Sequence, residues 1–202
     1  MKLKLFGPFG QKNKDDSRSS PEGFWRPGWD QYFMGIAVAV SQRANCLRGE
    51  YRVGAVIVKE NHIFGTGYNG TPSEMQDCIK EGCTYCRDKK KNGKSQLSVD
   101  HCICVHAEQN ALLSAARFGI SVRDATIFST VRPCPTCSKE MIQAGIKAVT
   151  YLKEWGSDHA DYEKQELKYI QAKLKINQFA QSLPLSFHIG YQTELESRKK
   201  AA

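Results

Sequence analysis

The 202-residue sequence lacks any long hydrophobic run. No window approaches the roughly 18–20 uninterrupted apolar residues that a membrane-spanning helix needs, so we expect no membrane partner. We also expect no secretory signal, because lysine, glycine and proline interrupt the first ten residues before an apolar core of roughly 7–15 residues could form. We therefore expect a cytoplasmic protein in a reducing compartment, where clustered cysteines bind metal more often than they form disulfides.

The net charge of +8 is the first feature that the sequence does have, and it suggests an anionic partner such as nucleic acid. Three segments account for all of it: residues 1–28 carry a net charge of +3, residues 87–94 carry +4 and residues 192–202 carry +1. The rest of the chain is neutral. The basicity therefore belongs to two flanks and one loop and not to the folded body, which fits a small anion better than nucleic acid.

Strand and helix signals alternate along the chain, which favours a layered α/β sheet. We expect a flexible basic arm at residues 1–28, a core at 29–155 with a Cys- and Lys-rich insertion at 71–105, and an extension of helix, strand and polar tail at 156–202. The expected helices cover residues 30–44, 106–118, 135–144 and 161–181, and the expected strands cover residues 53–58, 62–68 (after a hairpin turn at 59–61), 125–130, 148–152 and 185–191.

Two short motifs carry most of the chemistry, each at the start of an expected helix. The first is His106-Ala-Glu and the second is Pro133-Cys-Pro-Thr-Cys. Cys134 and Cys137 are three residues apart and share one helix face, and the helix N-terminus favours their thiolate forms. Together with His106 they offer three protein ligands for Zn²⁺ and leave a fourth position open, which is typical of a catalytic zinc site.

Glu108 is the expected catalytic residue. It lies two residues from His106, where its carboxylate can take a proton from a metal-bound water and pass it to a departing amine. A lone C-x-x-C is often structural or redox-active, and a lone H-x-E usually occurs by chance. Their combination is the known H-x-E…P-C-x-x-C signature of zinc nucleobase deaminases, which favours a zinc-dependent hydrolase.

With these motifs the sequence resembles the deoxycytidylate (dCMP) deaminase family of the cytidine deaminase-like superfamily, over about residues 29–155. The zinc motifs specify the superfamily, whereas the Gly67-Tyr-Asn-Gly-Thr-Pro loop and the Gln143-Ala-Gly-Ile turn point to the dCMP branch. The resemblance implies a three-layer α/β/α fold around a central mixed sheet of about five strands. It also implies hydrolytic deamination of dCMP to dUMP, which supplies the precursor of dTTP.

The same resemblance implies the roles of individual residues. Water activated by zinc attacks C4 of the cytosine, while Glu108 protonates N3 and then the leaving ammonia. Asn69 hydrogen-bonds the deoxyribose, and the backbone of Ala107 contacts the pyrimidine edge, although an Asn-Gly pair also suits an ordinary turn. For the phosphate, the residues themselves offer Arg132, next to the second zinc motif, and the basic loop 87–94.

Six further cysteines suggest a second metal site with a structural role. Some family members bind a second zinc through positions that match Cys46, Cys78 and Cys104. An overlapping set of candidate ligands has zinc-knuckle spacing within the insertion, namely Cys83, Cys86, Cys102 and Cys104. His101 is a further candidate ligand. The alternative is a set of buried free cysteines, which a polar, lysine-rich loop fits poorly. The cysteine candidates are Cys46, Cys78, Cys83, Cys86, Cys102 and Cys104.

The family also implies a homo-oligomer, commonly a hexamer, and regulation by dCTP and dTTP, with Mg²⁺ accompanying a regulatory nucleotide. Two other functions stay open. A deaminase acting on a nucleic-acid base, such as a tRNA adenosine or a single-strand cytosine, would use the basic segments for phosphate contacts, but aromatic stacking positions are not interleaved with them. A non-catalytic zinc-binding interaction module would leave Glu108 without a role.

Overall fold

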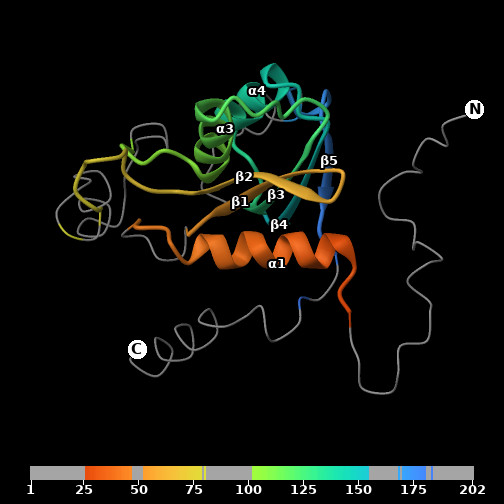
Figure 1. Ribbon diagram of the computed structural model, residues 1–202, viewed down its shortest axis with the longest axis horizontal. Coiled ribbons are helices and arrows are strands. Elements are labelled where there is room, and N and C mark those ends of the chain that lie inside the picture. The colour runs from red at the N-terminus through yellow and green to blue at the C-terminus, as the bar shows by residue number, and fades with distance from the viewer. Residues whose placement is uncertain are drawn as a thin grey trace, which may run out of the picture.

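The structure is a computed structural model that describes residues 26–46, 52–78, 80, 102–154, 168, 170–180 and 183. Its centre is a five-stranded sheet with the strand order β2-β1-β3-β4-β5. Helix α1 covers one face of the sheet, and α3 and α4 cover the other (Figure 1). This layered arrangement confirms the fold class. The elements are α1 (Trp29–Ser41), β1 (Gly54–Lys59), β2 (His62–Tyr68), α3 (Ala107–Arg117), β3 (Thr126–Val131), α4 (Pro135–Gln143), β4 (Ala148–Lys153) and β5 (Lys175–Gln178).

The sheet is mixed because its two halves are connected differently. β1 pairs antiparallel with both β2 and β3, whereas β3, β4 and β5 run parallel. The turn between β1 and β2 falls at Glu60 and Asn61, whose φ angles of 52° and 62° are both positive. A two-residue type I′ hairpin requires this conformation, so the turn expected at residues 59–61 is confirmed.

Both faces of strand β1 are buried. Ala55 and Ile57 belong to the core beneath α3 and α4, and Val56 and Val58 belong to the core above α1. Successive side chains of a strand point to opposite faces, so a strand that is covered on both sides needs apolar residues throughout. This is why the continuous apolar run at 53–58 predicts a strand.

Helix α3 lies very close to strand β2 at Gly67. A Cβ atom at this position would overlap the carbonyl oxygen of Ala107 and the amide nitrogen of Ala111. Both alanines are fully buried. The absence of a side chain on Gly67 and the small side chains of α3 therefore set the distance between helix and sheet. This distance also sets the depth of the first turn of α3, where His106 and Glu108 are found.

The C-terminal part of the fold differs from the expectation. The periodicity predicts one helix over 161–181, which is wrong at residues 175–178, because these form β5 and pair with β4. Leu174 and Phe179, on either side of β5, are buried in the two different cores. Strand pairing and burial on both faces override the local helical pattern. The sheet thus takes its fifth strand from beyond residue 155, the expected end of the core.

The other expected elements that fall on described residues are confirmed, with ends that shift by a few residues. The arm at 1–28, apart from 26–28, lies outside the described residues, as do the basic loop 87–94, most of the insertion at 71–105 and the expected strand at 185–191. Within the described part of the chain, no helix combines the length and the apolar character that crossing a bilayer requires.

Candidate metal centre

The structure brings the three expected zinc ligands together at the starts of two helices. His106 is the N-cap residue of α3, Cys134 is the N-cap residue of α4, and Cys137 lies in the first turn of α4. The Nδ1 atom of His106 is 3.4 Å from the sulfur of Cys134 and 3.4 Å from the sulfur of Cys137. Among the described residues, these three form a group whose ligand atoms all lie within 4.8 Å of one another.

This geometry fits a zinc ion. Tetrahedral bonds of about 2.0–2.1 Å to nitrogen and about 2.3 Å to sulfur place neighbouring nitrogen and sulfur ligands roughly 3.5 Å apart. Two thiolates and one imidazole are also the donors that zinc prefers, and three protein ligands leave one position open for water. The donor set and the distances therefore support a catalytic zinc centre.

Contact between the thiols of Cys134 and Cys137 changes the pKa of both groups. Hydrogen bonding from Cys137, aided by His106, lowers the pKa of Cys134 to about 5. The pKa of Cys137 is raised by its hydrogen bond to Cys134 and by its burial. Zinc would bind both cysteines as thiolates, so its binding would release the thiol protons that remain. The backbone N–H of Cys137 also donates to the sulfur of Cys134, which holds the first turn of α4 in shape.

The carboxyl group of Glu108 lies beside this cluster, as expected. Glu108 is 4% exposed, and the Cys137 thiol donates to its Oε2 atom over 3.7 Å. Burial raises the pKa of Glu108. Ser129, on β3, donates a hydrogen bond of 2.8 Å to the Oε1 atom. A buried carboxyl group with a raised pKa next to an open metal position can hold and transfer a proton.

Ser129 is a residue that the sequence motifs do not reveal. It is fully buried on β3, two residues after Ile127, and it faces the same side of the sheet. A polar side chain on the buried face of a strand needs a partner, which here is Glu108. The signal in the sequence is therefore the serine within the apolar strand pattern, but nothing local shows what it contacts.

Asn69 is fixed by the backbone next to β1. Its Oδ1 atom accepts a hydrogen bond of 2.7 Å from the N–H of Val53, and its own N–H donates to the carbonyl oxygen of Val53. Asn69 is 8% exposed. Ala107, the first residue of α3, is fully buried between His106 and Glu108. The expected roles of Asn69 and Ala107 toward a substrate stay predictions.

Arg132 directly follows β3 and is engaged with neighbouring side chains. Its Nη1 atom lies 3.3 Å from the carboxylate of Glu154, and its guanidinium group stands 5.6 Å from the centre of the Tyr151 ring. Its Nε and Nη2 atoms donate to the Oε1 atom of Gln171. Its expected role in phosphate binding stays a prediction, and any phosphate would share this guanidinium group with Glu154.

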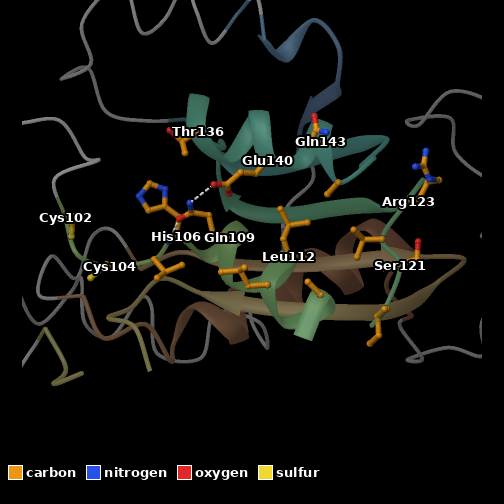
Figure 2. A pocket seen from close by; sticks show the side chains of 16 residues that line it. Cys102, Cys104, His106, Gln109, Leu112, Ser121, Arg123, Thr136, Glu140 and Gln143 are labelled. Atoms are coloured by element: carbon orange, nitrogen blue, oxygen red, sulfur yellow. Dashed lines mark hydrogen bonds between the residues drawn. The ribbon is translucent and has the colours of Figure 1, made fainter. Parts of the chain in front are cut away.

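A groove of about 1090 Å³ runs between α3 and α4. Figure 2 shows His106 beside Gln109 and Glu140, and Ser121 and Arg123 far from them along the same groove. Gln109 joins the two helices at the His106 end, because it donates to Glu140 and accepts from the backbone N–H of His106. Glu108, Asn69 and Arg132 are not among the residues that line the groove, so the expected substrate contacts do not converge there.

The cysteines expected at a second site also lie close together where they are described. Cys46, Cys78 and Cys104 form one buried cluster, and Cys102 packs against it. Hydrogen bonding with Cys102 and Cys46 raises the pKa of Cys104. The ligands expected at Cys83, Cys86 and His101 lie outside the described residues.

The loops that carry Cys46 and Cys78 are joined by Asn45. The side chain of Asn45 donates hydrogen bonds to Thr71 and Asp77, and its Oδ1 atom accepts one from the N–H of Thr71. These contacts hold the neighbours of both cysteines against each other.

The chain is similar in sequence to known proteins that share a zinc-binding region. Residues 27–153 match a family model described as the cytidine and deoxycytidylate deaminase zinc-binding region. The chain is 39% identical over 149 residues to the deoxycytidylate deaminase of Saccharomyces cerevisiae, covering 74% of this chain and 45% of that protein. It is 42% identical over 134 residues to the deoxycytidylate deaminase of Mycobacterium phage D29, covering 64% of this chain and 98% of that protein.

A solved structure is similar as well. The dCMP deaminase of the cyanophage S-TIM5 in complex with dCMP and dUMP has a TM-score of 0.56 and 29% identity, and covers 77% of this chain and 100% of that chain. The chain spans less than half the length of two yeast relatives that it matches, namely 45% of the Saccharomyces cerevisiae protein and 40% of the Schizosaccharomyces pombe protein.

Proposed function

The chain belongs to the cytidine and deoxycytidylate deaminase zinc-binding family, and on that basis we propose that it catalyses the hydrolytic deamination of dCMP to dUMP. The observation that carries the proposal is the buried carboxyl group of Glu108 beside the His106, Cys134 and Cys137 cluster. Curated relatives that share 39% and 42% identity with this chain carry the name deoxycytidylate deaminase. The reaction would supply the precursor of dTTP.

His106, Cys134 and Cys137 would hold the zinc ion, which would lower the pKa of a water molecule and so supply the nucleophile. As the water oxygen adds to C4 of the cytosine, Glu108 would take one proton from the water and deliver it to N3. It would then carry the second proton, from the hydroxyl group now on C4, to the amino group, so that the C4–N bond breaks and ammonia leaves. Ser129 donates to the Oε1 atom of the carboxyl group, and the Oε2 atom lies beside the sulfur of Cys137, where it would face the bound metal and the base. Burial keeps the pKa of Glu108 raised and thus suits it to carrying the proton.

Substrate contacts extend this proposal. Asn69 would bind the deoxyribose, and the backbone of Ala107 would contact the pyrimidine edge. The support for Asn69 is its fixed position, since Val53 holds its Oδ1 atom. Arg132 and the basic loop 87–94 would bind the phosphate. The support is their positive charge, since Arg132 lies next to the second zinc motif and the loop precedes the first one in the chain.

We further propose a second, structural zinc ion at the cysteine cluster. Its support is the burial of Cys46, Cys78 and Cys104 against one another, with Cys102 packed beside them. Four thiolates would complete a closed structural site. Cys83 and Cys86 stay alternative ligands.

A cytoplasmic homo-oligomer that responds to dCTP and dTTP, with Mg²⁺ on the regulatory nucleotide, completes the proposal. Reduced thiols at both cysteine groups suit the cytoplasm. Exposed apolar side chains in the C-terminal half of α3 and directly after it suit an interface between copies of the chain, since Leu113 is 60% exposed and Phe118 is 72% exposed.

The test is ammonia release from dCMP, cytidine, dCTP and a short oligonucleotide, with and without dCTP and dTTP as effectors. We expect dCMP to be the preferred substrate, and a preference for the oligonucleotide would contradict the proposal. Glu108→Gln should retain zinc and lose at least a hundredfold in turnover, because general acid–base catalysis contributes about 10²–10⁴-fold. Turnover near the wild-type rate in this variant would show that the mechanism is wrong.

A further inference from the structure

Gln171 lies outside the family-matched region, which ends at residue 153, yet its side chain reaches the zinc motif. It is 6% exposed and ends a helical turn that precedes β5. Its Nε2 atom donates hydrogen bonds to the carbonyl oxygen of Pro133 over 3.1 Å and to the hydroxyl oxygen of Ser138 over 3.2 Å. Its Oε1 atom accepts hydrogen bonds from Nε and Nη2 of Arg132 over 3.0 and 2.8 Å.

These bonds use both amide hydrogens of Gln171 and both lone pairs of its carbonyl oxygen. The three partners flank the zinc ligands in the chain: Arg132 and Pro133 come directly before Cys134, and Ser138 comes directly after Cys137. One buried side chain therefore spans the whole turn that presents the two sulfurs. We propose that Gln171 is a positioning residue for the zinc centre, which holds the Cys134–Cys137 turn in its metal-binding shape.

The need for such a residue follows from the local structure. The turn lies between the end of β3 at Val131 and the body of α4, and Pro133 has no N–H with which to join a hydrogen-bond ladder. Both sulfurs must keep their distance of 3.4 Å from Nδ1 of His106, which belongs to a different helix. Residues that orient metal ligands from outside the ligand set typically contribute about tenfold to a hundredfold in metal affinity or activity.

A purely structural role would be to attach the C-terminal segment to the domain. That role would depend on Leu174 and Phe179 as well, because these residues bury the segment in the two cores. A positioning role predicts something different, namely that loss of the amide donors changes the zinc centre more than it changes the stability of the fold.

The experiment uses the zinc-loaded full chain with Gln171→Met, Gln171→Glu and the control Gln178→Met, whose glutamine is exposed on β5. Zinc transfer to an excess of a coloured chelator is followed, and the absorption bands of the cobalt(II)-substituted protein report the thiolate geometry. We expect zinc release to be at least tenfold faster in Gln171→Met, with shifted cobalt bands, and unchanged in the control. Gln171→Glu keeps the acceptor for Arg132 and loses both donors, so it should resemble Gln171→Met.

Equal release rates in Gln171→Met and the control would overturn the proposal, and so would a Gln171→Glu variant that behaves as wild type. Urea unfolding identifies a general loss of stability, and a release rate that merely follows that loss also counts against the proposal. If Gln171→Met does not fold, Ser138→Ala removes one end of the same hydrogen bond, and it should also accelerate release and shift the cobalt bands. Neither readout needs a substrate, so failure of the proposed deamination is distinguished from failure of this proposal.

Discussion

The carboxyl group of Glu108 illustrates how single residues set the chemistry of the centre. One of its oxygens accepts from Ser129 and the other faces Cys137, so neither its position nor its orientation is free. A hydrogen bond to a charged group contributes roughly 1.5–3 kcal/mol, and a buried acceptor left without its donor costs a similar amount. In the proposed reaction, Ser129 would therefore act through Glu108, to which it donates its hydrogen bond.

Ser129→Ala should lower the turnover of dCMP by about tenfold to a hundredfold, because Glu108 loses the donor that orients it. The zinc content should stay that of the wild type, since His106, Cys134 and Cys137 are unchanged. Steady-state kinetics and metal analysis measure the two quantities. Ser121→Ala is the matched control, because Ser121 is exposed and lies far from His106 along the groove (Figure 2). A variant with full turnover, or one that has lost its zinc, would contradict this prediction.

The motif residues of the centre could be predicted because their spacing is itself the signal. His106 and Glu108, or Cys134 and Cys137, are close in the chain, and a helix start brings each pair to one side. Ser129 and Gln171 could not be predicted in this way. Their partners lie 21 residues away for Ser129 and 33 to 39 residues away for Gln171, and only the folded sheet brings them together.

At the scale of the elements, the zinc centre depends on how closely α3 approaches β2. Gly67 leaves no room for a side chain beneath Ala107, so the first turn of α3 is as near to the sheet as the backbone allows. His106 belongs to that turn, and its ring must meet two sulfurs from α4. A small displacement of α3 would thus separate the ligands, and the packing of one glycine bears on metal binding.

Gly67→Ala should reduce the free energy of unfolding by about 1–3 kcal/mol or more, since the added methyl group forces α3 and β2 apart. Zinc release should also become faster, because His106 moves with the helix. Urea denaturation and zinc transfer to a chelator check the two effects. Thr66→Ala serves as the control, because Thr66 is exposed on the same strand. Equal stability and equal zinc release in the two variants would contradict the prediction that the close packing at Gly67 supports metal binding.

Strand β5 shows the limit of local patterns at this scale. Leu174, Ile176 and Phe179 alternate with polar residues only briefly, and the surrounding sequence favours a helix. The chain becomes a strand there because β4 offers a free edge and both cores accept an apolar side chain next to it. The central strands β1, β3 and β4 were predictable, since their own apolar runs already require burial on both faces.

At the scale of the whole molecule, the two cores and the zinc centre depend on one another. The core beneath α3 and α4 contains the alanines of α3, Cys134, Cys137 and Leu174 from the C-terminal segment. Two of the expected metal ligands are therefore part of the hydrophobic core, and a zinc ion held by them and by His106 would connect α3 and α4. A ligand that binds the folded state and not the unfolded chain adds to stability by mass action. Zinc should thus stabilise the entire domain.

Removal of zinc by a chelator should abolish deamination and lower the melting temperature by about 8–16 °C for each proposed zinc site. This follows because free zinc at a thousand times its dissociation constant contributes about 4.1 kcal/mol, and each kcal/mol shifts the melting temperature of a domain of this size by about 2–4 °C. Added Zn²⁺ should restore both properties, whereas Mg²⁺, which prefers oxygen ligands, should restore neither. Calorimetry and ammonia release provide the measurements.

Two variants assign the loss to the two proposed sites. Cys134→Ser should lose activity and still show a chelator-dependent fall in melting temperature, because the zinc ion proposed at the Cys46, Cys78 and Cys104 cluster would remain bound. Cys104→Ser should show the opposite pattern. Its melting temperature should be lower than that of the wild type before any chelator is added, and its activity should still depend on zinc. A melting temperature that does not change on chelation in the wild-type protein would mean that neither site binds zinc tightly enough to stabilise the fold.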